Sequence, residues 1–175
     1  ELNLDTDKTI IGGVSAGGGL CAGLGLLVRD RGAFSILGQL LLYPMIDDRN
    51  VTDASDTLAD TLVWTRAANL FGWQSYLGNL FGGNNIPIYA APARATDLSG
   101  LPPTYLPVGD LDLFLDENLA YAQKLAHGGT PMHFHIFPGA YHGFNAFAPE
   151  APASVACNAE ISSFIAKLIG EADKN

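Results

Sequence analysis

The sequence predicts an α/β domain with a mostly parallel sheet flanked by helices. Apolar, strand-like runs alternate with helical runs along the chain, which is the pattern of parallel sheets. The 175 residues suffice for one domain, which hides roughly 70% of the surface of its unfolded chain. Hydrophobic residues make up 48% and charged residues 15%, so the composition is that of a globular chain.

The elements can be assigned in order along the chain. Residues 9–14 predict a buried strand, residues 17–31 a helix that ends at Gly32, and residues 36–43 a second strand. Two later strands are predicted at residues 104–109 and 132–137, separated by a helix over about 116–126. A last amphipathic helix over about 154–169 closes the chain.

The alternation breaks between the second and third strands, at about residues 48–100, and we read this stretch as an insertion. Residues 62–78, "LVWTRAANLFGWQSYLG", predict a helix that is apolar around most of its circumference. Its aromatic side chains could line an apolar substrate pocket as a lid, or could simply form core; they are Trp64, Phe71, Trp73 and Tyr76.

Charge and targeting features exclude several classes of partner. The net charge of −9 and pI near 4.6 argue against nucleic acid or an anionic membrane as a partner. Residues 1–5 lack the basic and apolar regions of a signal peptide, and no apolar run reaches membrane-spanning length. We expect a cytoplasmic protein in which Cys21 and Cys157 are reduced and buried, since they fit no metal or disulfide pattern.

Ser15 lies in "GVSAG", which fits the G-x-S-x-G pattern between a predicted strand and a predicted helix. A serine on such a sharp turn has a strained backbone, and we expect side chains at Gly13 or Gly17 to collide with the adjoining elements. The turn presents the hydroxyl at a helix N-terminus, where the N–H of Ala16 could stabilise an oxyanion. The pattern therefore favours a nucleophilic serine.

Two other interpretations fit the same glycines. Residues 17–22 also match G-x-G-x-x-A, the dinucleotide-binding pattern, with Asp47 and Asp48 after the next strand. Those carboxylates come later than the usual spacing of about 20 residues, and no phosphate-loop Lys-Ser/Thr follows. The glycines could also serve only to pack a helix tightly.

A base and an acid follow in the order that a serine nucleophile of this kind uses. Asp110, Asp112 and Asp116 come just after one predicted strand, and His142 comes in a glycine-rich loop after the last strand. Because the carboxyl ends of parallel strands share one sheet edge, we expect these side chains to gather near Ser15. Read alone, His142 could also be an ordinary turn residue.

The remaining histidines give weaker signals. His133 and His135 share one face of their strand and could form a metal pair, but no third ligand stands out, so we expect no metal. His127 fits a helix C-terminus, where a cation is favourable.

Four motifs follow one another along the chain, namely "GVSAGGG", "LLYPMID", "GDLDLFLDEN" and "PGAYHGF". In this order they resemble the α/β-hydrolase fold and, within it, the hormone-sensitive-lipase-like carboxylesterases. The likeness covers nearly the whole chain.

This resemblance implies a role for each matching position. Ser15 matches the nucleophile, Asp112 the acid and His142 the base, while Ala16 supplies an oxyanion amide and no cofactor is needed. Asp116 and Glu117 match a second acidic pair, which we interpret as local structure and helix N-terminal charge. The insertion matches part of the family's cap, and we expect a substrate pocket lined by Trp64, Phe71, Trp73 and Phe144.

The departures concern the start of the family's domain. Val14 replaces an acidic residue and Leu113 a proline, and neither change should stop the chemistry. The family's H-G-G-G loop, which supplies two further oxyanion amides, is absent together with the first four strands. The resemblance thus implies a C-terminal half whose first strand has an exposed edge, to be covered by self-association or a complementing chain.

The expected function is that of a serine carboxylesterase acting on small or short-acyl esters. The alternatives are a catalytically impaired fragment or non-catalytic binding remnant, and a nucleotide-binding module with its site at residues 17–19.

Overall fold

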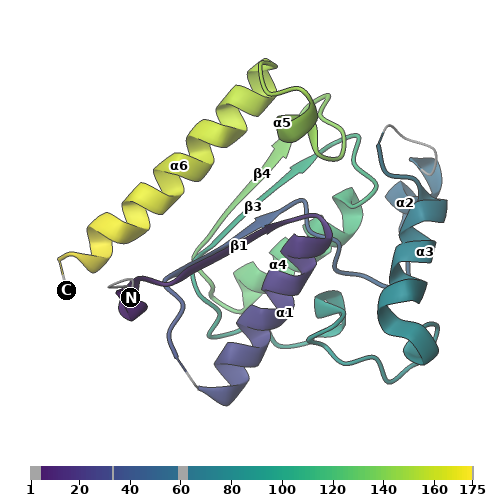
Figure 1. The fold of residues 1–175 in the computed structure, drawn as a ribbon, viewed down its shortest axis with the longest axis horizontal. Coiled ribbons are helices and arrows are strands. Elements are labelled where there is room, and N and C mark those ends of the chain that lie inside the picture. Colours follow the sequence, from purple (N-terminus) through teal and green to yellow (C-terminus); the bar gives the residue numbers. More distant parts are fainter. Residues whose placement is uncertain (1–4, 33, 59–62, 175) are drawn as a thin grey trace, which may run out of the picture.

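A computed structural model describes residues 5–32, 34–58 and 63–174 (Figure 1). Residues 1–4, at the acidic start, and Leu62, the first residue of the predicted insertion helix, lie outside these ranges. The strands are β1 (Ile10–Val14), β2 (Gly38–Leu42), β3 (Thr104–Gly109) and β4 (Met132–Phe137). The α-helices are α1 (Ala16–Arg31), α2 (Asp53–Thr57), α3 (Arg66–Leu77), α4 (Leu115–His127), α5 (Phe144–Phe147) and α6 (Pro152–Ala172). Short 3₁₀ helices are η1 (Thr6–Lys8), η2 (Gly78–Leu80) and η3 (Pro92–Arg94).

The four strands form one parallel sheet in the order β1-β2-β3-β4. Val14 at the end of β1 is in register with Leu42, and Gly109 at the end of β3 with Phe137. The predicted parallel sheet is therefore confirmed. Within the described residues β1 is an edge strand, and the side chain of Val14 is 47% exposed there.

Helices cover both faces of the sheet. Figure 1 shows α1 and α4 on one face and α6 on the other. Leu26 of α1 and Leu125 of α4 belong to the same buried cluster as Leu41 of β2, whereas Phe164 of α6 packs on Tyr105 of β3. The insertion helices α2 and α3 lie beyond the carboxyl ends of the strands, to the right of the N-terminus of α1 in Figure 1.

Most element bounds agree with the prediction, and the differences have local causes. β3 and β4 have the predicted bounds. Helix α3 is shorter than residues 62–78 because the Oγ1 of Thr65 accepts a hydrogen bond from the Ala68 N–H and so caps the helix start. Residues 36–37 lie outside β2; Leu37 instead packs near the cluster under α6.

The glycines of α1 allow it to pack closely on the segment that follows β2. A Cβ at Gly19 would lie 2.0 Å from the carbonyl oxygen of Met45, and one at Gly18 would lie 2.9 Å from Pro44 Cβ. The N–H of Gly19 also donates to Ser15 O within the helix. Gly18 and Gly19 thus serve tight helix packing, and the space that a phosphate would need at Gly19 is filled by protein.

Candidate active site

Ser15 occupies the sharp turn between β1 and α1. Its φ of 55° and ψ of −119° are strained for a residue with a Cβ, and the surrounding backbone holds them in place. The Ser15 N–H donates to Leu42 O, and the Ser15 carbonyl accepts from the N–H of Met45, both at 3.0 Å. The segments that hold the turn therefore come from β2 and the loop after it.

The two glycines that flank this turn differ in their surroundings. A Cβ at Gly13 would lie 2.2 Å from the carbonyl oxygen of Gly17, so the predicted collision is confirmed at Gly13. At Gly17 the same prediction is wrong, because a Cβ there would meet no described atom within 4 Å.

A chain of three polar side chains converges at this turn from three separate segments. The Nε2 atom of His142 lies 2.9 Å from Ser15 Oγ, and its Nδ1 atom lies 2.9 Å from Asp112 Oδ2. The other oxygen of Asp112 accepts a hydrogen bond from the Phe114 N–H at 2.9 Å. Asp112 and His142 are both buried. This arrangement can transfer the serine proton to an imidazole whose orientation a carboxylate fixes.

The structure distinguishes among the three aspartates that follow β3. Asp112 alone of the three contacts His142 within the described contacts. Asp110 accepts a hydrogen bond from the Gly139 N–H at 2.6 Å, and Asp116 accepts one from the Ala54 N–H at 2.7 Å. Asp110 therefore fixes the loop that carries His142, while Asp116 fixes the start of α2.

Two aromatic rings enclose the imidazole of His142. Tyr43 and Phe114 both contact it edge-to-face, with ring centroids 5.1 Å and 5.0 Å away. The hydroxyl of Tyr43 donates to Asn145 Oδ1 at 2.7 Å, which ties this ring to α5. The rings restrict the imidazole to a plane that reaches both Ser15 and Asp112.

Glu117 does more than place negative charge at the N-terminus of a helix. It also binds backbone N–H groups of a distant loop, which sequence reasoning did not predict. Its Oε1 accepts hydrogen bonds from the N–H groups of Ile46 at 2.9 Å and Asp47 at 3.4 Å. The next residue, Asn118, donates to Pro44 O at 2.9 Å. Burial raises the pKa of the Glu117 carboxyl well above its usual value, and the Ile46 N–H acts in the opposite direction. The start of α4 thus anchors the loop whose Met45 N–H holds Ser15.

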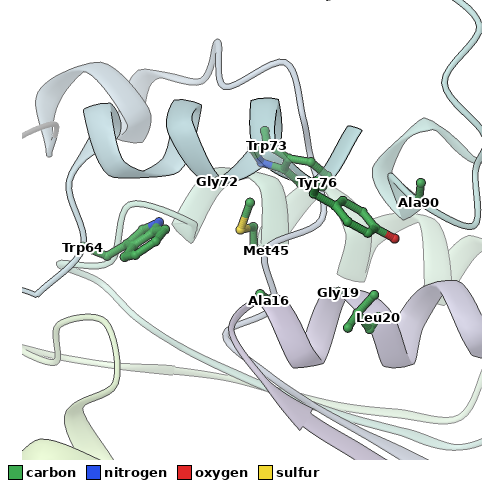
Figure 2. A pocket seen from close by; sticks show the side chains of 9 residues that line it. All are labelled: Ala16, Gly19, Leu20, Met45, Trp64, Gly72, Trp73, Tyr76 and Ala90. Carbon is green, nitrogen blue, oxygen red and sulfur yellow. The ribbon is translucent and has the colours of Figure 1, made fainter. Parts of the chain in front are cut away.

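A pocket of about 200 Å³ lies between α1 and the insertion helix α3 (Figure 2), and Ala16, directly after Ser15, lines it. Of the four expected lining residues, Trp64 and Trp73 line it. Its other lining residues are Ala16, Gly19, Leu20, Met45, Gly72, Tyr76 and Ala90. Sequence periodicity gave no signal for Met45 or Ala90, because they come from loops.

The other two expected pocket residues, Phe71 and Phe144, lie elsewhere. Phe71 is 73% exposed, because the inward face of α3 carries Asn69 and Trp73 and position 71 points away from it. Phe144 is 3% exposed and packs against Tyr43 and Phe137 in the core beneath α5. These two placements correct the prediction.

The two histidines of β4 make contacts away from the Ser15 site and, among the described residues, do not form part of a metal site. His133 and His135 do share a strand face, where His133 packs edge-to-face on Phe164 and His135 Nδ1 lies 2.9 Å from Glu160 Oε1. Across the described ranges, no group of three or more His, Cys, Asp or Glu side chains could hold a metal ion.

Both thiols are free, but only Cys157 is fully buried, whereas Cys21 is half-buried. Burial raises the pKa of Cys157 to about 11. None of the described helices is long and apolar enough to cross a membrane.

Comparison with known proteins identifies the family. A family model described as alpha/beta hydrolase fold matches residues 1–146. The chain therefore belongs to the alpha/beta-hydrolase family, and the resemblance drawn from its motifs is confirmed. "Esterase LipI" of Mycobacterium tuberculosis is 30% identical over 156 residues, covering 88% of this chain and 48% of that protein.

Solved structures agree with this assignment. A "Bacterial Heroin Esterase" superposes with a TM-score of 0.90 at 40% identity, covering 94% of this chain and 53% of that one. The esterase LipW from Mycobacterium marinum gives a TM-score of 0.87 at 33% identity, covering 94% and 51%. The chain thus spans about half the length of the relatives that it matches.

Proposed function

We propose that this chain carries the nucleophile, base and acid of a serine carboxylesterase. The observation that carries the proposal is the unbroken contact from Asp112 through His142 to Ser15, at 2.9 Å in each step. The relatives named as esterases support the reaction class. Ester hydrolysis by this route needs no metal or cofactor.

The chemistry would proceed in two halves. Ser15 Oγ attacks the acyl carbon of the ester while His142 Nε2 takes its proton, and the same proton then goes to the leaving alcohol. Asp112 holds the imidazole in the tautomer that accepts at Nε2 and stabilises the imidazolium. Water then attacks the acyl-enzyme, with His142 again as base, and releases the acid.

The oxyanion would be bound in part by the Ala16 N–H at the start of α1. The resemblance implies two further amides from an H-G-G-G loop, a motif that the sequence does not contain. Loss of one oxyanion donor lowers turnover by about 10²–10³. Full activity would therefore require donors from another segment.

The free edge of β1 is the place where such a segment would join. Val14 on this edge is 47% exposed and Leu20 on the adjoining helix is 55% exposed. An exposed parallel strand with apolar neighbours favours pairing with a further strand. We take the occupant to be a complementing chain segment, with self-association as the other outcome.

The insertion at about residues 48–100 would act as the cap over the substrate. Its helix α3 and the adjoining Trp64 form one wall of the pocket and face Ala16, the residue after Ser15, as Figure 2 shows. The pocket of about 200 Å³ is small compared with the roughly 300–1,000 Å³ of drug-sized ligand sites, which favours small or short-acyl esters.

The alternative is a non-catalytic binding remnant of such a hydrolase. In such a remnant the contact between His142 and Ser15 would persist without supporting turnover. Binding and catalysis therefore have to be tested separately.

The deciding experiment is mass spectrometry of the chain after reaction with a fluorophosphonate. We expect one adduct on Ser15 that disappears in Ser15→Ala and in His142→Ala, whereas Ser75→Ala on the exposed side of α3 labels as the wild type does. A folded chain with no adduct at Ser15 would exclude the esterase proposal for this polypeptide and leave the binding remnant.

A further inference from the structure

The pocket between α1 and α3 has several aromatic side chains in its walls. Three of its lining side chains are aromatic, namely Trp64, Trp73 and Tyr76, and Met45 adds a thioether between them (Figure 2). The ring planes of Trp73 and Tyr76 are inclined to each other by 51°, with centroids 6.1 Å apart, so the two rings face the pocket in different orientations. Aromatic and thioether groups attract a further ring beyond simple burial.

The volume restricts what such walls can hold. An apolar cavity of about 150 Å³ accepts benzene in a well-studied case, and this pocket measures about 200 Å³. It therefore has room for one aromatic ring with a small substituent, and a longer group would extend out of it past Leu20 and Tyr76, which are more than half exposed. Ala16, directly after Ser15, lines the same pocket, so a bound ring would lie next to the nucleophile.

We infer that this pocket is the site for a single aromatic ring of the ester substrate, and that Gly72 sets the size limit. The inference rests on the proposed function and specifies its substrate class as esters that carry one aromatic ring close to the ester bond.

Gly72 is the position at which size is set. A Cβ at Gly72 would lie 3.6 Å from Met45 Cε and 3.6 Å from Trp64 Cζ2, which is ordinary contact distance. An alanine would fit without backbone movement and would project a methyl group among the pocket walls. Glycine inside a helix is less favourable than alanine, so packing within α3 does not account for its presence. An open space for a ligand does account for it.

The chain contains its own reporter for a direct test. It has two tryptophans, and both line the pocket, so intrinsic tryptophan fluorescence reports on this site. The probes are benzyl alcohol and cyclohexylmethanol, which have similar size and polarity, differ in aromaticity and contain no ester. The matched control for Gly72→Ala is Gly170→Ala in α6, where an added Cβ meets no described atom within 4 Å.

We expect benzyl alcohol to bind about three- to tenfold more tightly than cyclohexylmethanol. Gly72→Ala should weaken benzyl alcohol binding by about fivefold or more, because the added methyl overfills the pocket, and Gly170→Ala should bind as the wild type does. Equal affinity for the two alcohols, no fluorescence response, or unchanged binding in Gly72→Ala would each overturn the inference.

This test and the test of the proposed function can fail independently. Binding of the aromatic ring without a Ser15 adduct would support the pocket assignment and contradict the esterase proposal. A Ser15 adduct without a preference for the aromatic alcohol would support the esterase proposal and contradict the aromatic substrate class.

Discussion

The Nδ1 atom of His142 lies 2.9 Å from Oδ2 of Asp112, and the other oxygen of the same carboxylate accepts the N–H of Phe114. Both side chains are buried, so water does not compete for the contact. The carboxylate thereby selects the tautomer with a proton on Nδ1 and leaves Nε2 free to accept from Ser15. Asp110, two residues earlier, fixes the loop before His142 instead.

Asp112→Asn should therefore lower the rate of fluorophosphonate labelling at Ser15 by about 10⁴-fold, the loss seen when a triad aspartate is amidated elsewhere. The expected cause is the wrong imidazole tautomer in an intact fold. The measurement is the labelling rate by mass spectrometry. Asp110→Asn, which keeps an oxygen for the Gly139 N–H, should label at nearly the wild-type rate. Equal rates in the two variants would contradict the assignment of Asp112.

Gly13→Ala should destabilise the fold strongly, because its Cβ would lie 2.2 Å from a backbone carbonyl that cannot move away. We expect a loss of about 3 kcal/mol or more in the free energy of unfolding, measured by chemical denaturation. The matched variant is Gly17→Ala, which adds a methyl in open space near the start of α1 and should be neutral or slightly stabilising. Equal loss in both variants would show that the described packing at Gly13 is wrong.

The sequence carried enough information for the strands, the turn and the order of the site residues. Thr104 and Met132 each follow a proline, which cannot donate a ladder hydrogen bond, and both strands begin where predicted. Ser15 and His142 lie in short motifs whose glycines permit tight turns, so local sequence indicates them. Asp112 was chosen from Asp110 and Asp116 by resemblance alone, and spacing did not separate them.

The features that sequence reasoning missed depend on contacts between distant segments. Glu117 reaches Ile46 across 71 positions, and nothing local shows that its carboxylate turns inward. We expected Phe144 to line the pocket, but α5 turns its ring into the core. Phe71 was misplaced because a helix that is apolar on most faces does not show which face is buried.

Tyr43 should act on His142 through its ring rather than its hydroxyl. Tyr43→Phe loses the hydrogen bond to Asn145, so we expect it to lose about 1 kcal/mol of stability and to label at Ser15 within about twofold of the wild-type rate. Tyr43→Leu removes one wall of the imidazole site and should slow labelling about tenfold or more. If both variants label at the same rate, the ring does not position His142.

Glu117 should make the free energy of unfolding fall as the pH rises, which is opposite to the usual effect of a carboxyl group. Burial raises the pKa of its carboxyl in the folded chain above the ordinary value of 4.5. The folded state therefore keeps a proton that the unfolded state has lost, and the contribution of Glu117 is fully present below pH 4.5. That contribution declines as the pH rises through the raised folded pKa.

Glu117→Gln keeps an oxygen for the N–H groups of Ile46 and Asp47 but cannot ionise. We expect its free energy of unfolding to fall less steeply above pH 4.5 than that of the wild type, as measured by chemical denaturation across pH. Glu150→Gln removes an exposed carboxyl and should leave the wild-type slope unchanged. Glu117→Ala should lose about 2–4 kcal/mol, because it leaves the Ile46 and Asp47 N–H groups without their acceptor. If the free energy of unfolding of Glu117→Gln has the same pH dependence as that of the wild type, the carboxyl is already ionised in the folded chain. Glu117 would then bind the loop that holds Ser15 as a charged hydrogen-bond acceptor.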